Sequence, residues 1–397
     1  MELSKKALEI SPSITLKVTA KAKEMKAQGI DVISFGAGEP DFNTPQNIIE
    51  AAVRAMNGGE TKYTQTSGIN ELKDAIINKF RNDNNLEYNR NNIIISTGAK
   101  QCLADVFTAI LNPNDEVLIP TPYWVSYPEL IKLSDGIPVF IECAKENDYK
   151  LTVESLNLAV TKRTKAIVIN SPNNPSGVVY TEEELKQILE FSIKNDLIII
   201  SDEIYEKLIY DNEKHVSIAS LSKDAKERTI VINGVSKSYA MTGWRIGYAA
   251  ADEKIIKLMT NIQSHVTSNP NTIAQYASLE ALTGPQDTIR DMIIEFEKRR
   301  NYMIEKIERI NGVTYIKPRG AFYVMLNIDS FIGKKVNGNQ IKGSLDFAEF
   351  LLEEEKVAVI PGIAFGLDNY IRLSYAMSLQ NIINGIDRIE NFIARIS

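Results

Sequence analysis

The segment Asn233-Gly-Val-Ser-Lys-Ser-Tyr-Ala-Met-Thr-Gly-Trp-Arg-Ile-Gly-Tyr248 follows directly on a strand-like run, Thr229-Ile-Val-Ile-Asn233. It carries Lys237 among small residues and Arg245 eight positions later. A lysine amine in this setting is a candidate Schiff-base nucleophile for a carbonyl compound, and the planar fork of an arginine suits a phosphate. A Ser-Lys pair alone would more often mark a solvated surface lysine, so the interpretation rests on the whole segment.

Short apolar runs alternate with helical patterns along most of the chain. The pattern from Glu182 to Lys194, for example, has apolar residues at helical spacing. Continuous β-branched runs suit strands that are covered on both faces. The alternation therefore predicts an α/β fold with a mainly parallel sheet. The runs are 32–35, 92–96, 116–119, 138–141, 166–170, 197–201 and 229–233.

The C-terminal part of the sequence is organised differently. A long, charged amphipathic pattern from Thr288 to Ile310 predicts a helix. After it come a strand-like run at 322–326, a helical pattern near 344–355, a second strand-like run at 357–360 and a last helical pattern from about Gln380. This order predicts a smaller α+β unit.

The composition excludes several classes of function. The chain has 397 residues and a formal net charge of −6, which gives no electrostatic reason to expect nucleic acid or an anionic membrane as a partner. Its two cysteines, Cys102 and Cys143, and its two histidines, His215 and His265, form no disulfide or metal-ligand pattern, so no metal site is predicted. No apolar run approaches the length of a membrane span, and the N-terminal residues lack the apolar core of a secretion signal. We therefore expect a cytoplasmic protein.

Chemically distinctive residues follow several predicted strands, where the ligand of a parallel α/β sheet is expected. Asp202 ends one run and Tyr205 follows three positions later. Such a carboxylate can keep a pyridine nitrogen protonated, although it would also suit a helix cap. Asn174 lies in a rigid, proline-rich loop after another run. Arg372 lies in a short alternating strand, where it either grips a carboxylate through a bidentate pair or is exposed.

Two further strand ends carry candidate ligand-binding residues. Gly98, Ala99 and Lys100 open a helical pattern, and backbone N–H groups at a helix N-terminus can face a phosphate. Many strand-helix loops have similar residues, so this signal is weak alone. Trp124, one of two tryptophans, follows the next strand-like run, where its ring either stacks on a flat ligand or packs in the core.

The segment Gly36-Ala-Gly-Glu-Pro-Asp-Phe42 begins like a dinucleotide-binding fingerprint. That fingerprint requires a third glycine, and Asp41 stands at its position, preceded by a proline. A nicotinamide-dependent dehydrogenase is therefore rejected.

Together these segments resemble the class I (aspartate-type) pyridoxal-phosphate-dependent aminotransferases, in particular the bacterial aspartate aminotransferase branch with its Gly-Glu-Pro-Asp-Phe and Met-Thr-Gly-Trp-Arg-Ile-Gly-Tyr motifs. The matches keep their order from Gly36 to Arg372. The resemblance implies fold type I of the pyridoxal-phosphate enzymes, in which a large domain with a mainly parallel seven-stranded sheet packs with a smaller α+β domain. It places the large, cofactor-binding domain at 46–285, and the small domain at 1–45 and 286–397.

The resemblance also implies roles for individual residues. Lys237, Asp202 and Tyr205 would be catalytic: Lys237 as Schiff base and proton shuttle, Asp202 on the ring nitrogen, and Tyr205 with Asn174 on the ring oxygen. The implied binding residues for pyridoxal 5'-phosphate are Gly98, Ala99, Lys100, Trp124, Asn174, Asp202, Tyr205, Lys237, Arg245 and Tyr63. The implied substrate-binding residues are Gly38, Lys100, Trp124, Asn174 and Arg372. Tyr63 matches a tyrosine that serves the neighbouring subunit, which implies a homodimer with shared active sites.

The implied reaction moves an amino group between an amino acid, aspartate or glutamate above all, and a 2-oxo acid by a ping-pong mechanism. The more familiar aspartate aminotransferases grip the distal carboxylate with an arginine, but the matching region, 264–271, contains none. The resembled branch assigns this task to Lys100, helped by Thr15.

Three alternatives remain at this point. Aromatic substrates or prephenate are accepted by some members with the same threonine and lysine, and a β-lyase shares most of the cofactor site. A transcription regulator on this fold would need an added basic DNA-binding unit, and only about thirty residues precede the first predicted strand.

Overall fold

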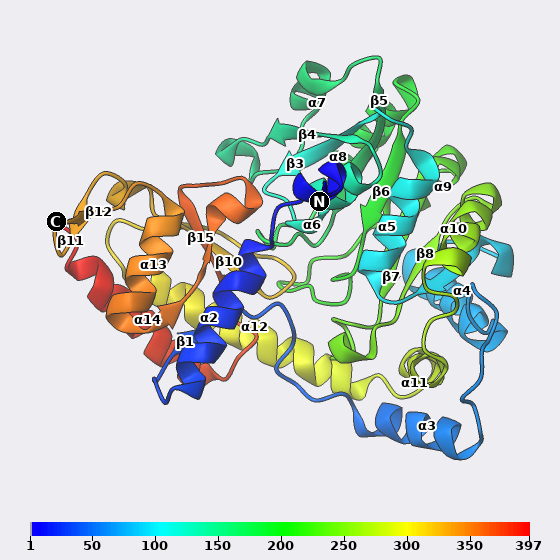
Figure 1. Cartoon of the computed structure of the whole chain (residues 1–397), viewed down its shortest axis with the longest axis horizontal. Coiled ribbons are helices and arrows are strands. Elements are labelled where there is room, and N and C mark those ends of the chain that lie inside the picture. Colours follow the sequence, from blue (N-terminus) through cyan, green and yellow to red (C-terminus); the bar gives the residue numbers. More distant parts are fainter. Residues whose placement is uncertain (1) are drawn as a thin grey trace.

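The computed structural model describes residues 2–397, and its two main sheets lie in the right and left halves of Figure 1. The larger sheet has seven strands in the order β2-β8-β7-β6-β5-β3-β4. Neighbouring strands are parallel except at β8, which is antiparallel to both β2 and β7. The predicted α/β fold with a mainly parallel, seven-stranded sheet is thus confirmed. The strands are β2 Ile93–Ser96, β3 Glu116–Thr121, β4 Ile137–Glu142, β5 Thr164–Asn170, β6 Ile198–Asp202, β7 Thr229–Gly234 and β8 Gly247–Ala250.

Helices cover both faces of this sheet. Ile93 and Ile95 of β2 belong to one apolar cluster and Ile94 to another, because side chains alternate between the faces of a strand. Burial on both faces explains why the strand sequences are continuously apolar. The helices of this half are α3 Gln46–Asn57, α4 Asn70–Asn84, α5 Ala99–Ile110, α6 Ser126–Leu133, α7 Val153–Ala159, α8 Glu182–Lys194, α9 Lys223–Arg228, α10 Glu253–Val266 and α11 Thr272–Thr283.

One predicted strand lies outside the large sheet, and one strand of that sheet escaped prediction. The run at 32–35 forms β1 (Ile33–Ser34), which pairs in parallel with β13 (Val357–Ala358). The remaining strand of the large sheet is β8, whose glycine and alanine residues carry little strand signal. Gly247 is needed in β8 because a Cβ at this position would lie 2.2 Å from the backbone nitrogen of Ala99.

The smaller sheet is antiparallel, in the order β14-β15-β10-β9, and packs with three long helices around one apolar cluster. The predicted helices are confirmed, with α12 ending at Ile307 rather than Ile310. The strand predicted at 357–360 is divided, because the chain passes from β13 into β14 at Val359. The elements are β9 Thr314–Ile316, β10 Tyr323–Asn327, β14 Ile360–Pro361, β15 Tyr370–Ser374, the hairpin β11 Lys335–Val336 and β12 Asn339–Gln340, α12 Asp287–Ile307, α13 Ser344–Glu355 and α14 Leu379–Ala394.

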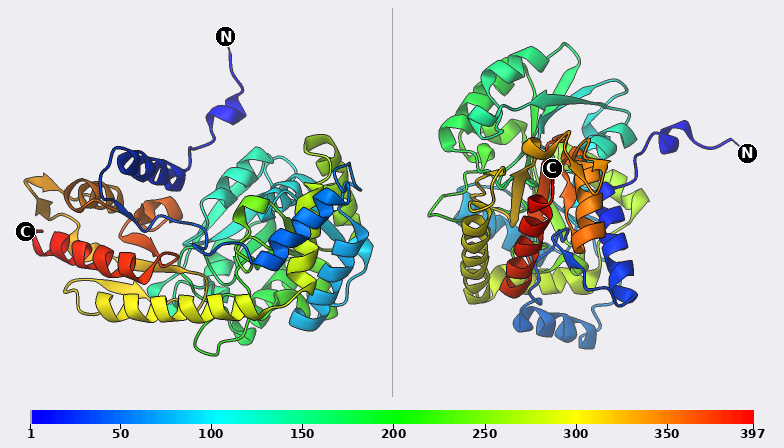
Figure 2. Two further views of the ribbon diagram at one scale, coloured as in Figure 1. Left: turned by 90° about the horizontal axis from the view of Figure 1, so that it is seen from below. Right: turned by 90° about the vertical axis from the view of Figure 1, so that its left-hand side faces the viewer.

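The N-terminal segment contains α1 (Lys5–Leu8) and α2 (Ile14–Ala27). Figure 2 shows the segment before α2 projecting from that helix, and α1 contacts α6, where Lys6 forms an ion pair with Asp135 at 2.7 Å. Helix α2 buries only Ala22 and packs against β13 and β14, so most of its surface is free. Across residues 2–397, no helix is both long and apolar enough to cross a membrane.

Candidate active site

A cavity of about 660 Å³ lies at the carboxyl ends of β5, β6 and β7 and is closed by α2 and the small sheet. Asn170 ends β5, Asp202 ends β6 and Lys237 follows β7. From the small sheet, Tyr323 of β10 and Arg372 of β15 reach the same space. Ligands of parallel sheets bind at this edge, so the cavity joins residues that the sequence separates widely.

Lys237 presents its amine to the cavity. Nζ donates a hydrogen bond to the carbonyl oxygen of Gly38 at 2.5 Å, and the residue is half-buried. Burial lowers the pKa of Lys237 to about 8; the carboxylate of Glu39 opposes this shift. The positive charges of Arg372 and Arg245 lower the pKa of Lys237 further. A substantial neutral and nucleophilic fraction of the amine therefore exists near neutral pH.

Asp202 places a carboxylate in the same cavity while being only 4% exposed. Its Oδ2 accepts a hydrogen bond from the hydroxyl of Tyr127 at 2.7 Å, and its Oδ1 accepts one from the backbone N–H of Ile204 at 3.3 Å. Burial raises the pKa of Asp202 to about 6, and these two bonds limit the rise. Each carboxylate oxygen has a second acceptor position, so Asp202 can still bind a donor in the cavity.

Tyr205 and Asn174 are held by contacts from other strands. The hydroxyl of Tyr205 lies 3.0 Å from that of Tyr323, and burial raises the pKa of Tyr205 well above its usual range, so the hydroxyl stays protonated. The backbone N–H of Asn174 donates to the side chain of Asn170 at 2.8 Å. Asn170 donates in turn to the carbonyl oxygen of Asp202 at 2.9 Å. The proline-rich loop is thereby tied to the end of β6.

The N-terminus of α5 forms an anion-binding end of the cavity. Gly98 is its N-cap, with φ +84°, and a Cβ there would lie 2.5 Å from Nη2 of Arg245. Arg245 has a left-handed backbone, with φ 57°, and its Nη1 donates to the carbonyl oxygen of Thr242 at 3.0 Å. Ala99 and Lys100 line the cavity beside it. A helix N-terminus without a side-chain cap and an arginine fork together suit a phosphate.

Trp124 contacts Lys100 and Tyr127. Its ring is 5.0 Å from Nζ of Lys100, a cation–π distance, and it packs edge-to-face on Tyr127 with centroids 5.3 Å apart. Trp124 and Lys100 both line the cavity, as predicted for residues that contact cofactor and substrate.

Arg372 is 3% exposed and lines the cavity. Its Nη1 donates to Oδ1 of Asn174 at 3.1 Å and its Nη2 to the carbonyl oxygen of Gly36 at 3.2 Å. The guanidinium is 4.3 Å from the ring of Tyr323. In the described chain its Nε has no hydrogen-bond partner and no carboxylate compensates its charge. An uncompensated buried charge is costly, so this group suits an anion that enters from the cavity.

The known proteins most relevant to this cavity are aminotransferases. The family model described as "Aminotransferase class I and II" matches residues 30–389. An aspartate aminotransferase of Bacillus subtilis (strain 168) is 53% identical over 397 residues, which are 100% of both chains. The chain belongs to the class I and II aminotransferases. A "probable aspartate/prephenate aminotransferase" of Aquifex aeolicus (strain VF5) is 47% identical over 99% of each chain.

Two solved aminotransferase structures agree with this fold over nearly the whole chain. The aspartate aminotransferase from Rhizobium meliloti superposes with a TM-score of 0.97 at 42% identity and covers 100% of both chains. The aspartate aminotransferase from Thermus thermophilus with maleate has a TM-score of 0.92 at 40% identity and covers 99% of this chain and 100% of its own. The large cavity therefore belongs to an enzyme scaffold.

Aminotransferases of this family depend on pyridoxal 5'-phosphate, and the residues of the cavity fit this group. Lys237 offers an amine for its aldehyde, and Asp202 offers a buried carboxylate for its ring nitrogen. The space beside Gly98, which a Cβ would fill against Arg245, leaves the helix end open to a phosphate. An amine, a carboxylate and an anion site are thus present in one cavity.

Tyr63 lies apart from the other predicted site residues. It is 91% exposed between α3 and α4 and does not line the cavity. Its assignment to the site of a neighbouring subunit stays a prediction.

Three residues at the cavity escaped the sequence analysis. Asn170 ends a strand as Asp202 does, and Tyr127 follows Trp124 by one helical turn, so both positions carried a usable signal. Tyr323 carried none, because its contact with Tyr205 depends on how the small sheet packs on the large one.

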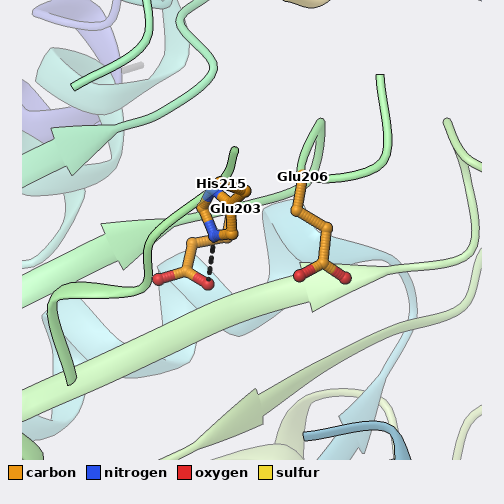
Figure 3. A group of neighbouring side chains, drawn as sticks. All are labelled: Glu203, Glu206 and His215. Atoms are coloured by element: carbon orange, nitrogen blue, oxygen red, sulfur yellow. Dashed lines mark hydrogen bonds and ion pairs between the residues drawn. The ribbon is translucent and has the colours of Figure 1, made fainter. Parts of the chain in front are cut away.

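A second group of ionisable side chains, Glu203, Glu206 and His215, has its ligand atoms within 4.8 Å of one another (Figure 3), and none of the three lines the cavity. Nε2 of His215 is 3.0 Å from Glu203, and Glu206 forms a buried ion pair with Lys79. Two serine hydroxyls donate to the other oxygen of Glu203 at 2.9 and 2.7 Å. Because protein donors already satisfy these carboxylates, we interpret the group as a structural ion cluster rather than a metal site.

Proposed function

We propose that the protein transfers the amino group of aspartate or glutamate to a 2-oxo acid, with pyridoxal 5'-phosphate as cofactor. The observation that carries the proposal is Arg372, a buried guanidinium at the cavity with no carboxylate partner in the described chain. A substrate carboxylate supplies the missing counter-charge. The B. subtilis relative is named an aspartate aminotransferase, and the T. thermophilus structure was solved with maleate, a dicarboxylate.

The charge of the cavity wall supports an acidic substrate. Six basic side chains line the cavity against two acidic ones, although the formal net charge of the chain is −6. Once a phosphate is bound, positive charge remains for a substrate with two carboxylates. The basic residues are Lys23, Lys26, Lys100, Lys237, Arg245 and Arg372, and the acidic ones are Glu39 and Asp202.

Pyridoxal phosphate supplies an aldehyde that condenses with amines and a protonated pyridine ring that withdraws electrons from the substrate Cα. Lys237 would hold the cofactor covalently through its amine, and the same amine, once released, would take the proton from the substrate Cα and deliver it to the cofactor carbon. The lowered pKa of Lys237 suits both tasks, since each requires the neutral amine. Asp202 would present its carboxylate to the ring nitrogen and keep it protonated.

Arg372 binds the α-carboxylate of the substrate. The side chain of Asn174 and the carbonyl group of Gly36 fix the plane of its guanidinium before substrate arrives. Such preorganisation lowers the entropic cost of reaching the reactive geometry. Tyr205 and Asn174, which line the cavity, would hold the ring oxygen of the cofactor.

Lys100, with Thr15, binds the distal carboxylate of acidic substrates. Both residues line the cavity. Among residues 2–397 Lys100 belongs to no ion pair, and the hydroxyl of Thr15 lies 2.8 Å from that of Ser13. A hydrogen bond to a charged group is worth about 1.5–3 kcal/mol. Lys100→Ala should therefore lower kcat/KM for aspartate by roughly ten- to a hundredfold, and should affect a neutral aromatic amino acid much less.

The matched control for this test is Lys254→Ala. Lys254 is the second residue of α10 and exposed, as Lys100 is the second residue of α5 and exposed, but it does not line the cavity. Equal losses for acidic and neutral donors in Lys100→Ala would assign Lys100 to the phosphate alone. No loss for either would remove it from the site.

A second candidate substrate is prephenate, or an aromatic amino acid. The A. aeolicus relative at 47% identity is named for both aspartate and prephenate. A screen of amino donors and oxo acid acceptors on the purified enzyme separates these substrates. Ping-pong kinetics with an oxo acid acceptor would distinguish transamination from β-elimination.

The proposed active unit is a homodimer in which Tyr63 contacts the phosphate in the partner's site. Its nearly complete exposure leaves it free for such a contact. Sedimentation at micromolar concentration should give about twice the chain mass of 44.4 kDa. Tyr63→Phe should weaken cofactor binding, and full activity in a stable monomer would exclude shared sites.

Two further features belong to the proposal. The large domain comprises residues 46–285, and the small domain comprises 1–45 and 286–397; the pairing of β1 with β13 supports the joining of both chain ends in one domain. The cytoplasm is the proposed location. The free, buried thiols of Cys102 and Cys143 suit a reducing compartment.

A further inference from the structure

Tyr127 lies between two of the proposed cofactor contacts. It is 2% exposed, on the first turn of α6, and it lines the cavity. Its hydroxyl donates to Oδ2 of Asp202 at 2.7 Å. Its ring packs edge-to-face on Trp124, with centroids 5.3 Å apart and planes at 80°. One side chain therefore touches both the ring that would stack on the cofactor and the carboxylate that would face its nitrogen.

The local fold explains how Tyr127 reaches Asp202. Trp124 and Tyr127 are three residues apart, and the backbone N–H of Tyr127 donates to the carbonyl oxygen of Trp124 at 3.1 Å, so both side chains leave the same turn. This turn follows β3, which is separated from β6 by β5 in the sheet. The phenol side chain spans that separation and brings its hydroxyl to Asp202.

The carboxylate of Asp202 has few other donors. Its remaining hydrogen bond, from the N–H of Ile204, is long at 3.3 Å. Of the charged groups near it, Glu203 disfavours its ionised form and Lys237 favours it. Burial raises the pKa of Tyr127 well above its usual range, so its hydroxyl remains a donor throughout the neutral pH range. Tyr127 thus supplies the shortest hydrogen bond that Asp202 receives from the chain.

We propose that Tyr127 is a positioning residue that orients and stabilises the ionised carboxylate of Asp202, so that this carboxylate can hold the proton on the cofactor ring nitrogen. This inference rests on the proposed role of Asp202. Tyr127 acts through Asp202 and needs no contact with the reacting atoms of the substrate. The contact with Trp124 fixes the position of the Tyr127 ring and does not involve the Tyr127 hydroxyl.

The direct test is Tyr127→Phe, which removes the hydroxyl and keeps the ring against Trp124. The holoenzyme is reconstituted with pyridoxal phosphate labelled with ¹⁵N in its ring. The nitrogen signal should move toward the value of an unprotonated pyridine, and kcat for transamination should fall roughly tenfold, the lower end of what a charged hydrogen bond contributes. The matched control is Tyr88→Phe. Tyr88 is also buried and also packs edge-to-face on an aromatic ring at 5.3 Å, but its hydroxyl has no partner among residues 2–397.

A double-mutant cycle with Asp202→Asn separates the possible explanations. If Tyr127 acts through Asp202, Tyr127→Phe should change kcat less than twofold in the Asp202→Asn background. An equally large loss in both backgrounds, or an unchanged nitrogen signal in Tyr127→Phe, would overturn the inference. If Asp202→Asn alone leaves kcat and the nitrogen signal unchanged, the proposed role of Asp202 fails instead. Thermal unfolding of each variant, compared with Tyr88→Phe, identifies any loss that comes from misfolding.

Discussion

The active-site cavity and the ion cluster each contain a buried carboxyl group near the end of β6, but the pKa values of these two groups shift in opposite directions. Asp202 faces the cavity, and burial raises its pKa to about 6 because its protein partners do not fully replace water. Glu206 belongs to the ion cluster. Burial alone would raise its pKa, but Lys79, His215 and Lys207 together lower it to about 2. The difference separates carboxylates that have room for a ligand from those that only stabilise the fold.

Two buried arginines show the same contrast. Arg300 of α12 is 1% exposed and forms a bidentate pair with Asp211 at 2.6 and 3.0 Å. Arg372 is 3% exposed and has no carboxylate partner in the described chain. Burial alone therefore does not mark a functional residue. A buried charge that the chain leaves uncompensated is the better signal, because it is retained at a cost to stability.

The largest expected effect is that of Lys237→Ala. Removing the amine should lower transamination turnover by about 10⁴-fold or more, since it removes both the covalent attachment and the proton transfer. The variant should still bind pyridoxal phosphate, and borohydride should no longer fix the cofactor on the peptide that contains residue 237. Steady-state kinetics and peptide mass measurement check these outcomes.

Lys79→Met is the counterpart of Lys237→Ala in the ion cluster. It breaks the buried pair with Glu206 and should lower the free energy of unfolding by about 3–5 kcal/mol. The folded variant should keep its turnover within a few fold. Loss of turnover in Lys79→Met as large as that in Lys237→Ala would break the distinction between the cavity and the ion cluster.

The next largest effects are expected from replacing the two arginines. Loss of Arg372 should reduce activity, whereas loss of Arg300 should reduce stability. Arg372→Leu should lower kcat/KM for every amino acid by roughly 10²–10³-fold, as for other preorganised charge contacts, and should leave the apoenzyme at least as stable as the wild type. Arg300→Leu should lower the free energy of unfolding by about 1.5–3 kcal/mol, because it removes the charged hydrogen bonds to Asp211 and the one to the carbonyl oxygen of Pro318. Kinetics and urea unfolding on both variants test the contrast. It would be lost if Arg372→Leu proved the less stable protein.

The smallest effect concerns stability against pH. The folded apoenzyme holds a proton on Asp202 up to about pH 6, whereas the unfolded chain releases it near pH 4. The contribution of Asp202 to stability therefore falls as pH rises from about 4 to 6. Relative to that of the wild type, the free energy of unfolding of Asp202→Asn should rise by on the order of 1–3 kcal/mol across this pH interval. Above about pH 6 the difference should stay constant. Urea unfolding of the apoenzymes at fixed protein concentration measures the difference.

Glu206→Gln should behave in the opposite way. The folded pKa of Glu206 lies at about 2, below the ordinary value near 4.5. Its stabilising contribution is therefore present above about pH 4.5 and is lost as pH falls toward 2. The variant should be less stable than wild type at neutral pH, with a gap that narrows on acidification. Parallel pH profiles for Asp202→Asn and Glu206→Gln would remove the physical basis for separating the two groups.

Much of the fold and site is already determined by the sequence alone. The continuous β-branched runs predict buried parallel strands, because only strands covered on both faces have no polar side. The residues that follow those runs, Asp202 and Lys237 among them, are placed at one edge of the sheet by the direction of the strands. The family motif then predicts what these residues do. For such features the signal is local, a period or a short segment that needs no distant partner.

Only the tertiary structure decides the rest. It places the run at 32–35 beside β13 instead of in the large sheet, brings Tyr127 to Asp202, and sets Tyr323 against Tyr205. These contacts join residues far apart in the chain, and they depend on side-chain length and on how two sheets pack, which no local pattern encodes. Whether a buried charge meets a partner is decided in the same way. Packing thus distinguishes Arg372, whose charge the described chain leaves uncompensated, from the paired Arg300 of α12.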